Sequence, residues 1–259
     1  MKIGVFDSGL GGLVIAKALM TALPQYDYIY YGDTAHLPYG EKTPGRILSY
    51  TLEAIRFLIE KDCSLIIIAC NTATAITLRY LQKRFCPKEA PNVKILGVII
   101  PTVEEALKND EKIIGVVGTP TTIHSDIYGV ELRKIDSNVK VVSLETPLLV
   151  PAIEANDFIR ADESVVQYSQ VFQNIPALIL GCTHYPLIKD LFQKHLPQTR
   201  LVCQDDLIGK KLTDYLKRHP EIEIKLSRRG DRRFFVSSLS DSYTQVAQKL
   251  FPKIQLERK

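Results

Sequence analysis

The order of apolar and polar positions predicts short strands that alternate with amphipathic helices. Uncharged runs of strand type occupy residues 3–6, 65–69, 113–117 and 177–180. Between them, apolar residues recur three and four positions apart, which is the spacing of a helix with one buried face. Continuous apolar strands are typical of parallel sheets that helices cover on both faces. The chain is therefore expected to be an α/β protein built from βαβ units.

The remaining elements follow from the same two patterns. Further strands are expected over residues 28–31, 94–99, 139–144, 200–203 and 234–236. Helices are expected over residues 13–23, 44–59, 73–85, 101–109, 147–156, 161–172, 207–217 and 242–251. No low-complexity linker divides the chain, but residues 65–72 and 177–184 are alike. That likeness suggests two related α/β domains that face each other, each with a mostly parallel sheet.

Both of these similar segments place a cysteine where an apolar strand ends and a helix begins. The two cysteines are Cys70 and Cys182, and each precedes polar residues. Those polar neighbours are Asn71, Thr72, Thr183 and His184. In open α/β sheets, ligands bind at the carboxyl ends of strands. Because a helix N-terminus also favours the thiolate form of a cysteine, both thiols are candidates for chemistry.

The residues leave four interpretations of these two thiols open. They could be core cysteines, although their polar neighbours would be costly in a core. Cys182 and His184 could ligate a metal, but a Cys-x-x-Cys pair and a histidine cluster are missing from the sequence. Cys182 could be a nucleophile with His184 as its base, which leaves Cys70 without a role. One thiolate and one thiol on facing domains could instead remove a proton from a stereogenic carbon and return it on the opposite face.

A glycine-rich turn follows the first strand and brings a carboxylate to a strand end. It begins with Asp7 and Ser8 and continues as Gly9-Leu10-Gly11-Gly12. Glycines at such a turn let the backbone approach an anion, which a helix N-terminus attracts. The spacing does not match the dinucleotide fingerprint. Asp7 and His184 are the candidates to determine which thiol holds the proton.

Charge and cysteine content narrow the class of protein. The net charge of +4 is small for 259 residues, and the one basic cluster, residues 228–233, is interpreted as a solvated turn before a strand. No nucleic-acid partner is therefore expected. No apolar run reaches membrane-spanning length and no signal peptide opens the chain, so a cytoplasmic protein is expected. Five cysteines without disulfide spacing fit that compartment, and Cys63, Cys86 and Cys203 are assigned to the core.

Taken together, several motifs resemble the glutamate racemases of the cofactor-independent aspartate/glutamate racemase superfamily. The likeness spans nearly the whole chain, and the two cysteine motifs in this order are its most specific part. The matching segments are Asp7-Ser8-Gly9-x-Gly11-Gly12, Gly32-Asp33-Thr34, Pro38-Tyr39-Gly40, residues 69–73, residues 118–128, residues 147–154 and residues 181–187. The sequence departs from the family pattern at His36, Thr74 and Thr146, where Arg, Ser and Cys are usual.

The resemblance implies a role for each matching position. Cys70 and Cys182 would be the catalytic acid/base pair, assisted by Asp7 and His184. The substrate's charged groups would be held by Asp7, Ser8, Tyr39, Gly40, Asn71, Thr72, Thr183 and His184. Supporting positions near the site would be Asp33, Glu154, Thr119 and Thr122. The resemblance implies no cofactor and no metal.

The resemblance also implies a function and a domain division. The enzyme would interconvert L- and D-glutamate and so supply D-glutamate for peptidoglycan, with a second copy of the chain as a candidate partner. Residues 1–96 and 207–259 would form the domain that carries Cys70, and residues 97–206 the domain that carries Cys182. A racemase for aspartate, a cysteine hydrolase that uses Cys182 and His184, and a non-catalytic binder of small anions remain the alternatives.

Overall fold

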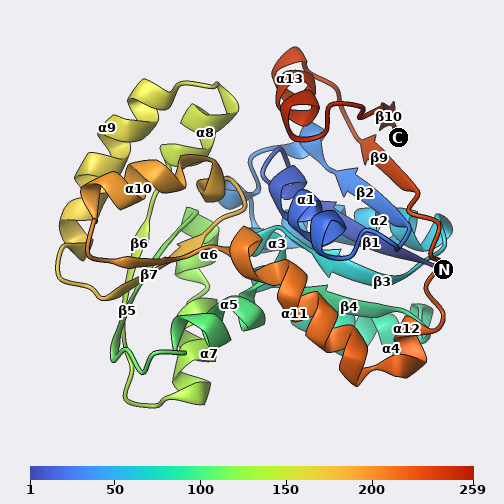
Figure 1. The fold of residues 1–259 in the computed structure, drawn as a ribbon, viewed down its shortest axis with the longest axis horizontal. Helices are drawn as coiled ribbons and strands as arrows, with labels where there is room; N and C mark the ends of the chain where they lie inside the picture. The colour runs from blue at the N-terminus through green and yellow to red at the C-terminus, as the bar shows by residue number, and fades with distance from the viewer.

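The computed structural model describes residues 1–259 apart from Ser242, and it has two lobes, each built on its own parallel sheet (Figure 1). The larger sheet has the order β10-β9-β2-β1-β3-β4. Its strands are β1 (Lys2–Asp7), β2 (Tyr28–Gly32), β3 (Cys63–Ile68), β4 (Lys94–Gly97), β9 (Arg232–Val236) and β10 (Leu256–Arg258). The smaller sheet has the order β6-β5-β7-β8. Its strands are β5 (Ile113–Gly118), β6 (Lys140–Glu145), β7 (Ala177–Gly181) and β8 (Arg200–Val202).

Helices connect these strands and cover both faces of the sheets, which confirms the predicted fold class (Figure 1). The longer helices are α1 (Gly12–Ala22), α2 (Pro44–Glu60), α3 (Asn71–Tyr80), α5 (Ile99–Ala106), α7 (Ile127–Ile135), α9 (Phe158–Ser169), α11 (Gln204–Arg218) and α13 (Asp241–Leu250). The shorter ones are α4 (Cys86–Glu89), α6 (Pro120–His124), α8 (Leu149–Glu154), α10 (Lys189–His195) and α12 (Pro220–Glu223). A π-helical stretch (Leu81–Phe85) follows α3, and 3-10 turns occupy Thr34–His36, Tyr39–Glu41, Gln170–Phe172 and Tyr185–Ile188.

The central strands of the two sheets are buried on both faces, as their uninterrupted apolar character predicts. Ile3 and Val5 of β1 pack into one apolar cluster, whereas Phe6 packs into a second cluster on the other face. Strands β5 and β7 are buried in the same way within the smaller sheet. In both sheets the central pairs are parallel and in register up to their carboxyl ends. The residues that follow β1, β3 and β7 therefore gather at sheet edges that face each other.

Some boundaries differ from those expected. The strand expected over residues 94–99 ends at Gly97, because Ile99 already begins α5 and Pro101 lies in its first turn, where a missing N–H costs nothing. Helices α6 and α7 were not predicted, and neither was the short edge strand β10. The helix predicted over residues 242–251 agrees with α13 to within one residue at each end. Ser242 itself lies outside the described residues.

The basic cluster around residue 230 forms a turn and the start of β9, as expected. Gly230 has a φ of +75°, which suits glycine, and the Asp27 carboxylate accepts hydrogen bonds from the backbone N–H groups of Arg229 and Asp231. Arg228 pairs with Glu223. None of the helices that the structure describes is long and apolar enough to cross a membrane.

Candidate active site

A small cavity lies between the two lobes, where the strand ends of both sheets meet. Its volume is about 20 Å³, which is room for about one water molecule. Its lining consists of Ser8, Leu37, Pro38, Tyr39, Gly40, Cys70, Asn71, Thr72, Thr119, Val150, Cys182, Thr183 and His184. Both predicted thiols therefore line one cavity, and they reach it from different sheets.

Cys70 lies at the N-terminal end of α3 and is nearly buried. Its Sγ accepts a hydrogen bond from the backbone N–H of Ala73 over 3.4 Å, so the thiol caps the helix. The Ser8 hydroxyl lies 3.4 Å from the same sulfur. Burial, together with the neighbouring Asp7 carboxylate, raises the pKa of the Cys70 thiol to about 12, and the contacts from Ser8 and Ala73 only partly oppose this. A thiol with so high a pKa carries its proton at neutral pH.

Cys182 has a different set of neighbours. Its Sγ lies 3.6 Å from Nδ1 of His184, and Nε2 of the same ring lies 2.5 Å from Oε1 of Glu154. Burial of His184 opposes a charge on the ring, but the contacts with Cys182 and Glu154 outweigh it and raise the pKa of His184 well above its usual value. The Glu154 carboxyl is also largely buried, yet its hydrogen bond to His184 keeps its pKa below the usual value. A protonated imidazole ring therefore lies beside the Cys182 sulfur.

Asp7 lies at the end of β1 and links the two lobes. Its Oδ2 accepts hydrogen bonds from the backbone N–H groups of Gly9 and Gly12, and its Oδ1 accepts one from the Thr183 hydroxyl over 3.3 Å. Complete burial raises the pKa of Asp7 to about 6, although His184 and these hydrogen bonds oppose the rise. The glycine-rich turn thus binds the protein's own carboxylate rather than an external anion. A Cβ on Gly12 would lie 2.1 Å from that of Asp7, so only glycine fits there.

Hydroxyl groups from both lobes meet beside Cys70. The Oγ1 atom of Thr72 lies 2.9 Å from that of Thr119 and 3.1 Å from that of Thr122, and the latter two lie 2.9 Å apart. Thr72 and Thr119 line the cavity, whereas Thr122 lies behind them. A Cβ on Gly40 would lie 2.5 Å from the Thr119 side chain, so this glycine is needed where the first lobe approaches the second.

The loop that contains Tyr39 closes one side of the cavity. The Tyr39 hydroxyl donates to Oδ2 of Asp33 over 2.6 Å, and Asp33 also lies 2.9 Å from Nδ1 of His36. The His36 ring stacks on Tyr50 at 3.9 Å between ring centroids. Asp33 is buried but does not line the cavity, so it supports the loop. His36 anchors the same loop through Asp33.

The structure brings most of the predicted residues together, in two layers. Those that line the cavity are Ser8, Tyr39, Gly40, Cys70, Asn71, Thr72, Thr119, Cys182, Thr183 and His184. Asp7, Asp33, Glu154 and Thr122 lie behind them as hydrogen-bond partners. Sequence reasoning missed the apolar residues Leu37 and Val150 of the lining, and also Gln204, which bonds to Asn71. Nothing in the local pattern distinguishes Gln204 from an ordinary first residue of a helix.

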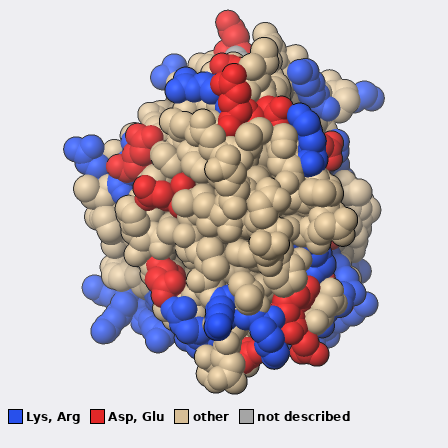
Figure 2. Space-filling view, turned by 90° about the vertical axis from the view of Figure 1, so that its left-hand side faces the viewer, with Lys and Arg blue, Asp and Glu red and all other residues tan. Residues whose placement is uncertain are grey.

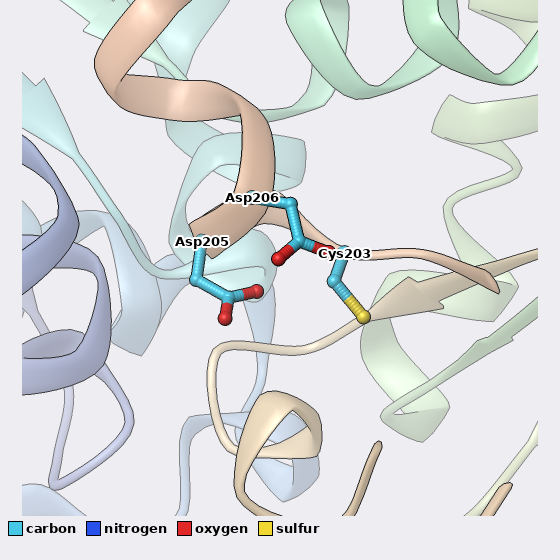
Figure 3. A group of neighbouring side chains, drawn as sticks. All are labelled: Cys203, Asp205 and Asp206. Atoms are coloured by element: carbon cyan, nitrogen blue, oxygen red, sulfur yellow. The ribbon is translucent and has the colours of Figure 1, made fainter. Parts of the chain in front are cut away.

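A second group of potential metal ligands lies at the start of α11, outside the cavity. Cys203, Asp205 and Asp206 each offer an atom within 4.8 Å of the others, and Figure 3 shows their side chains around the first turn of the helix. The ammonium of Lys189 already pairs with Asp206, and the positive end of the helix disfavours a cation. Burial also raises the pKa of the Cys203 thiol, which opposes the thiolate that a metal requires. The residues therefore fit a metal poorly.

Comparisons with known proteins agree with this geometry. The profile of the Asp/Glu/Hydantoin racemase family matches residues 14–204. A glutamate racemase from Streptococcus gordonii is 34% identical over 256 residues, which cover 95% of this chain and 93% of that protein. The structure of glutamate racemase isoform RacE1 from Bacillus anthracis has a TM-score of 0.90 at 31% identity and covers 100% of this chain and 97% of that one. The structure of a Francisella tularensis glutamate racemase in complex with D-glutamate has a TM-score of 0.88 at 34% identity, with the same coverage.

The matched region runs from the first helix to the start of α11 and contains both cysteines of the cavity. The similarity of the whole chains, in sequence and in structure, extends beyond that region at both ends. The chain belongs to the Asp/Glu/hydantoin racemase family.

Proposed function

We propose that this protein interconverts L- and D-glutamate by a two-base mechanism that uses Cys70 and Cys182. The observation that carries the proposal is the position of the two thiols, which line one cavity from two different sheets. A thiolate on one side takes the proton from Cα, and the bonding electrons remain on the substrate as a carbanion. The thiol on the other side then gives its proton to the opposite face. One turnover inverts the carbon and exchanges the protonation states of the two cysteines, so atoms and charge balance.

The surroundings of the cavity provide what such a reaction needs. The carbanion is stabilised when hydrogen-bond donors hold the substrate carboxylate, and Ser8, Asn71, Thr72 and Thr183 place donors in the lining. Tyr39, Gly40 and His184 complete the proposed substrate contacts, while Asp7 and His184 assist proton transfer. Asp33, Glu154, Thr119 and Thr122 support these groups.

Substrate entry requires the two lobes to move apart. The cavity of about 20 Å³ has no room for an amino acid as it stands. Because the lining comes from both lobes, their separation would open it. We propose that the lobes correspond to residues 1–96 with 207–259 and to residues 97–206, in line with the strands of each sheet.

Glutamate is proposed over aspartate because the full-length relatives that match this chain are named glutamate racemases. Its product, D-glutamate, would supply peptidoglycan synthesis. The proposal needs no cofactor, since both bases are residues of the chain. The five cysteines are all unpaired, which supports a reducing compartment such as the cytoplasm.

A second candidate function rests on a specific observation. Cys182, His184 and Glu154 form a chain of contacts that resembles the thiol, imidazole and carboxylate of a cysteine hydrolase. In that case Cys70 would have no role, and a substrate would be trapped as a thioester on Cys182. The two-base reaction is preferred because it uses both thiols of the cavity.

Circular dichroism of purified protein with each enantiomer tests the choice. The proposal expects the signal of L-glutamate and of D-glutamate to decay to zero, while aspartate changes little. A faster loss of signal from aspartate would reassign the substrate. No change with either amino acid, combined with a thioester on Cys182 by mass spectrometry, would support the hydrolase.

We also propose that the protein pairs with a second copy rather than with nucleic acid. Large apolar side chains are exposed around α9, and Figure 2 shows that the face on this side of the molecule has no charged side chains at its centre. The exposed apolar side chains are Leu148, Phe158, Ile159, Val166 and Val171. Apolar patches of this kind are typical of protein interfaces. Sedimentation of the wild type and of Ile159→Glu would test this, since the charge should shift a dimer toward monomer.

A further inference from the structure

The amide of Asn71, the residue after Cys70, is held by residues of the other lobe. Its Nδ2 donates to Oε1 of Gln204 over 3.0 Å, and its Oδ1 accepts from Nε2 of Gln204 in return. The Tyr128 hydroxyl also donates to Oδ1 over 2.6 Å and accepts from Gln204 over 3.1 Å. All three side chains are buried, and Gln204 has no exposed surface. The proposed function does not by itself account for this network.

Counting donors and acceptors shows what the network leaves for a ligand. The Asn71 carbonyl oxygen accepts two hydrogen bonds, which uses its full capacity. Its amino group can donate two but donates only one, to Gln204. The second N–H has no acceptor among the residues that the structure describes, and Asn71 lines the cavity. A single N–H donor therefore remains, and its natural partner is an anionic oxygen such as a carboxylate.

The reciprocal pairing restricts rotation of the amide. If Asn71 alone turned by half a turn, its N–H groups would face those of Gln204, and two carbonyl oxygens would also meet. An unsatisfied buried polar group costs about 1–3 kcal/mol. Asn71 can therefore turn only together with Gln204, whereas Tyr128, which both donates and accepts, imposes no direction by itself.

We propose that Gln204 is a positioning residue, which holds the Asn71 amide so that its unpaired N–H meets the carboxylate of an amino acid bound in the cavity. This inference rests on the proposed function for the identity of the ligand. Gln204 is the first residue of α11, the helix that follows the last strand of the smaller sheet. The inference adds this residue to those that recognise the substrate. The hydrogen bond that Gln204 positions is made to the bound substrate as well as to the carbanion, so its loss should weaken substrate affinity much more than it slows turnover.

The test compares Gln204→Met, Asn71→Ala and the double variant, with Gln82→Met as the matched control. Gln82 also donates a hydrogen bond, to the carbonyl of Ile95, but lies outside the cavity. For each protein, kcat and KM for L-glutamate are measured by circular dichroism, the Kd of D-glutamate by calorimetry, and Tm by thermal unfolding. Gln204→Asn, which keeps the amide but shortens it by one methylene, is the second variant in case the methionine destabilises the fold.

We expect Gln204→Met and Gln204→Asn to raise KM and Kd roughly 10-fold, as for the loss of a hydrogen bond to a charged group, with kcat within about threefold of wild type. In the Asn71→Ala background, Gln204→Met should add less than about twofold, because the two residues act through one amide. Gln82→Met should change neither constant. The inference would be overturned if Gln204→Met raised KM and Kd equally in wild type and in Asn71→Ala. It would also be overturned if folded Gln204 variants kept the KM and Kd of wild type. If wild type binds D-glutamate but does not racemise it, the proposed function fails, and the Kd values still decide the role of Gln204.

Discussion

The two thiols of the cavity occupy similar positions in the fold but have different chemical neighbours. Each follows an apolar parallel strand and precedes a helical turn. Cys70 caps a helix beside the Ser8 hydroxyl. Burial and the nearby Asp7 carboxylate raise the pKa of this thiol, so it holds a proton. Cys182 faces the His184 imidazole, whose pKa is raised by the contact with Cys182 and by the half-buried Glu154 carboxylate. The strand-and-helix pattern is thus repeated, whereas the assisting groups are not.

This difference shows how one cavity can serve two mirror-image substrates. L- and D-glutamate have equal free energy in water, so the equilibrium constant of the reaction is one, whatever the enzyme does. The assisting groups can nevertheless differ, because each thiol faces only one enantiomer. Asp7 is the carboxylate near Cys70, and His184 is the cation beside Cys182. The structure therefore predicts that each direction of the reaction depends on a different assistant.

The largest expected effect comes from removing either thiol. Cys70→Ser and Cys182→Ser should each lower racemisation by roughly 10⁴-fold or more, because serine is a far weaker acid and neither base can replace the other. Both variants should still catalyse elimination from a β-chloro amino acid, which needs only one deprotonation. Racemisation is measured by circular dichroism and elimination by the ketoacid formed. Near-wild-type racemisation by either variant would show that one base suffices.

The next effect should distinguish the two sides of the cavity. His184→Asn removes the cation beside Cys182, and Asp7→Asn removes the carboxylate near Cys70. Each should lower kcat by roughly 10²–10⁴-fold in one direction and less in the other, with opposite bias. Because the equilibrium constant stays at one, any bias in kcat must be matched in KM. Initial rates from both enantiomers provide the measurement, and equal slowing of both directions by both variants would contradict the assignment.

A smaller effect is expected on the stability of the fold, through the titration of Asp7. Its pKa rises from 3.8 to about 6 on folding, so the folded protein binds the proton more tightly than the unfolded chain does. The free energy of unfolding should therefore fall as the pH rises from 3.8 to about 6, by an amount on the order of 3 kcal/mol from Asp7 alone.

Asp7→Asn cannot titrate, so comparison with wild type removes the contribution of all other groups. The free energy of unfolding of wild type minus that of the variant should be larger at pH 4 than at pH 7. Urea unfolding of both proteins at the two pH values measures this difference. A difference that does not change between the two pH values would mean that burial does not perturb Asp7.

The smallest expected effect is that of chelators. Extensive dialysis against a chelator should leave activity within about twofold of its starting value, since both bases belong to the chain and the residues around Cys203 fit a metal poorly. The same protein should show no absorbance from a bound aldimine. Activity that is lost on chelation and restored by zinc would show that a metal takes part.

Local sequence patterns determine some features of the molecule and not others. Apolar runs such as residues 65–69 predicted the buried strands correctly, because a strand that is covered on both faces must be apolar throughout. The strand-end positions of Cys70 and Cys182 indicated a site because parallel strands end at one edge of a sheet. Their assignment as a proton-transfer pair also needed the resemblance to racemases, since the residues alone left four interpretations open.

Other features depend on contacts between distant segments and could not be predicted from local patterns. Gln204 forms hydrogen bonds with Asn71, although 133 positions separate them in the sequence. The strand β10 pairs with β9 only because the C-terminal segment returns to the edge of the larger sheet. Glu154 lies 30 positions from His184 along the chain, yet its hydrogen bond, together with the contact from Cys182, raises the pKa of that ring.

The central claim is that one thiolate removes the α-proton and a thiol on the opposite face delivers a different proton. Isotope incorporation in D₂O tests it most directly. Wild-type protein is given protiated L-glutamate, and substrate and product are separated at low conversion and analysed by mass spectrometry. Two separate bases predict one deuterium at Cα of every D-glutamate formed, while the remaining L-glutamate keeps its hydrogen. The experiment is then repeated from D-glutamate, with the same result expected. A product that retains the substrate's own α-hydrogen, or deuterium that appears in the substrate before inversion, would contradict the account.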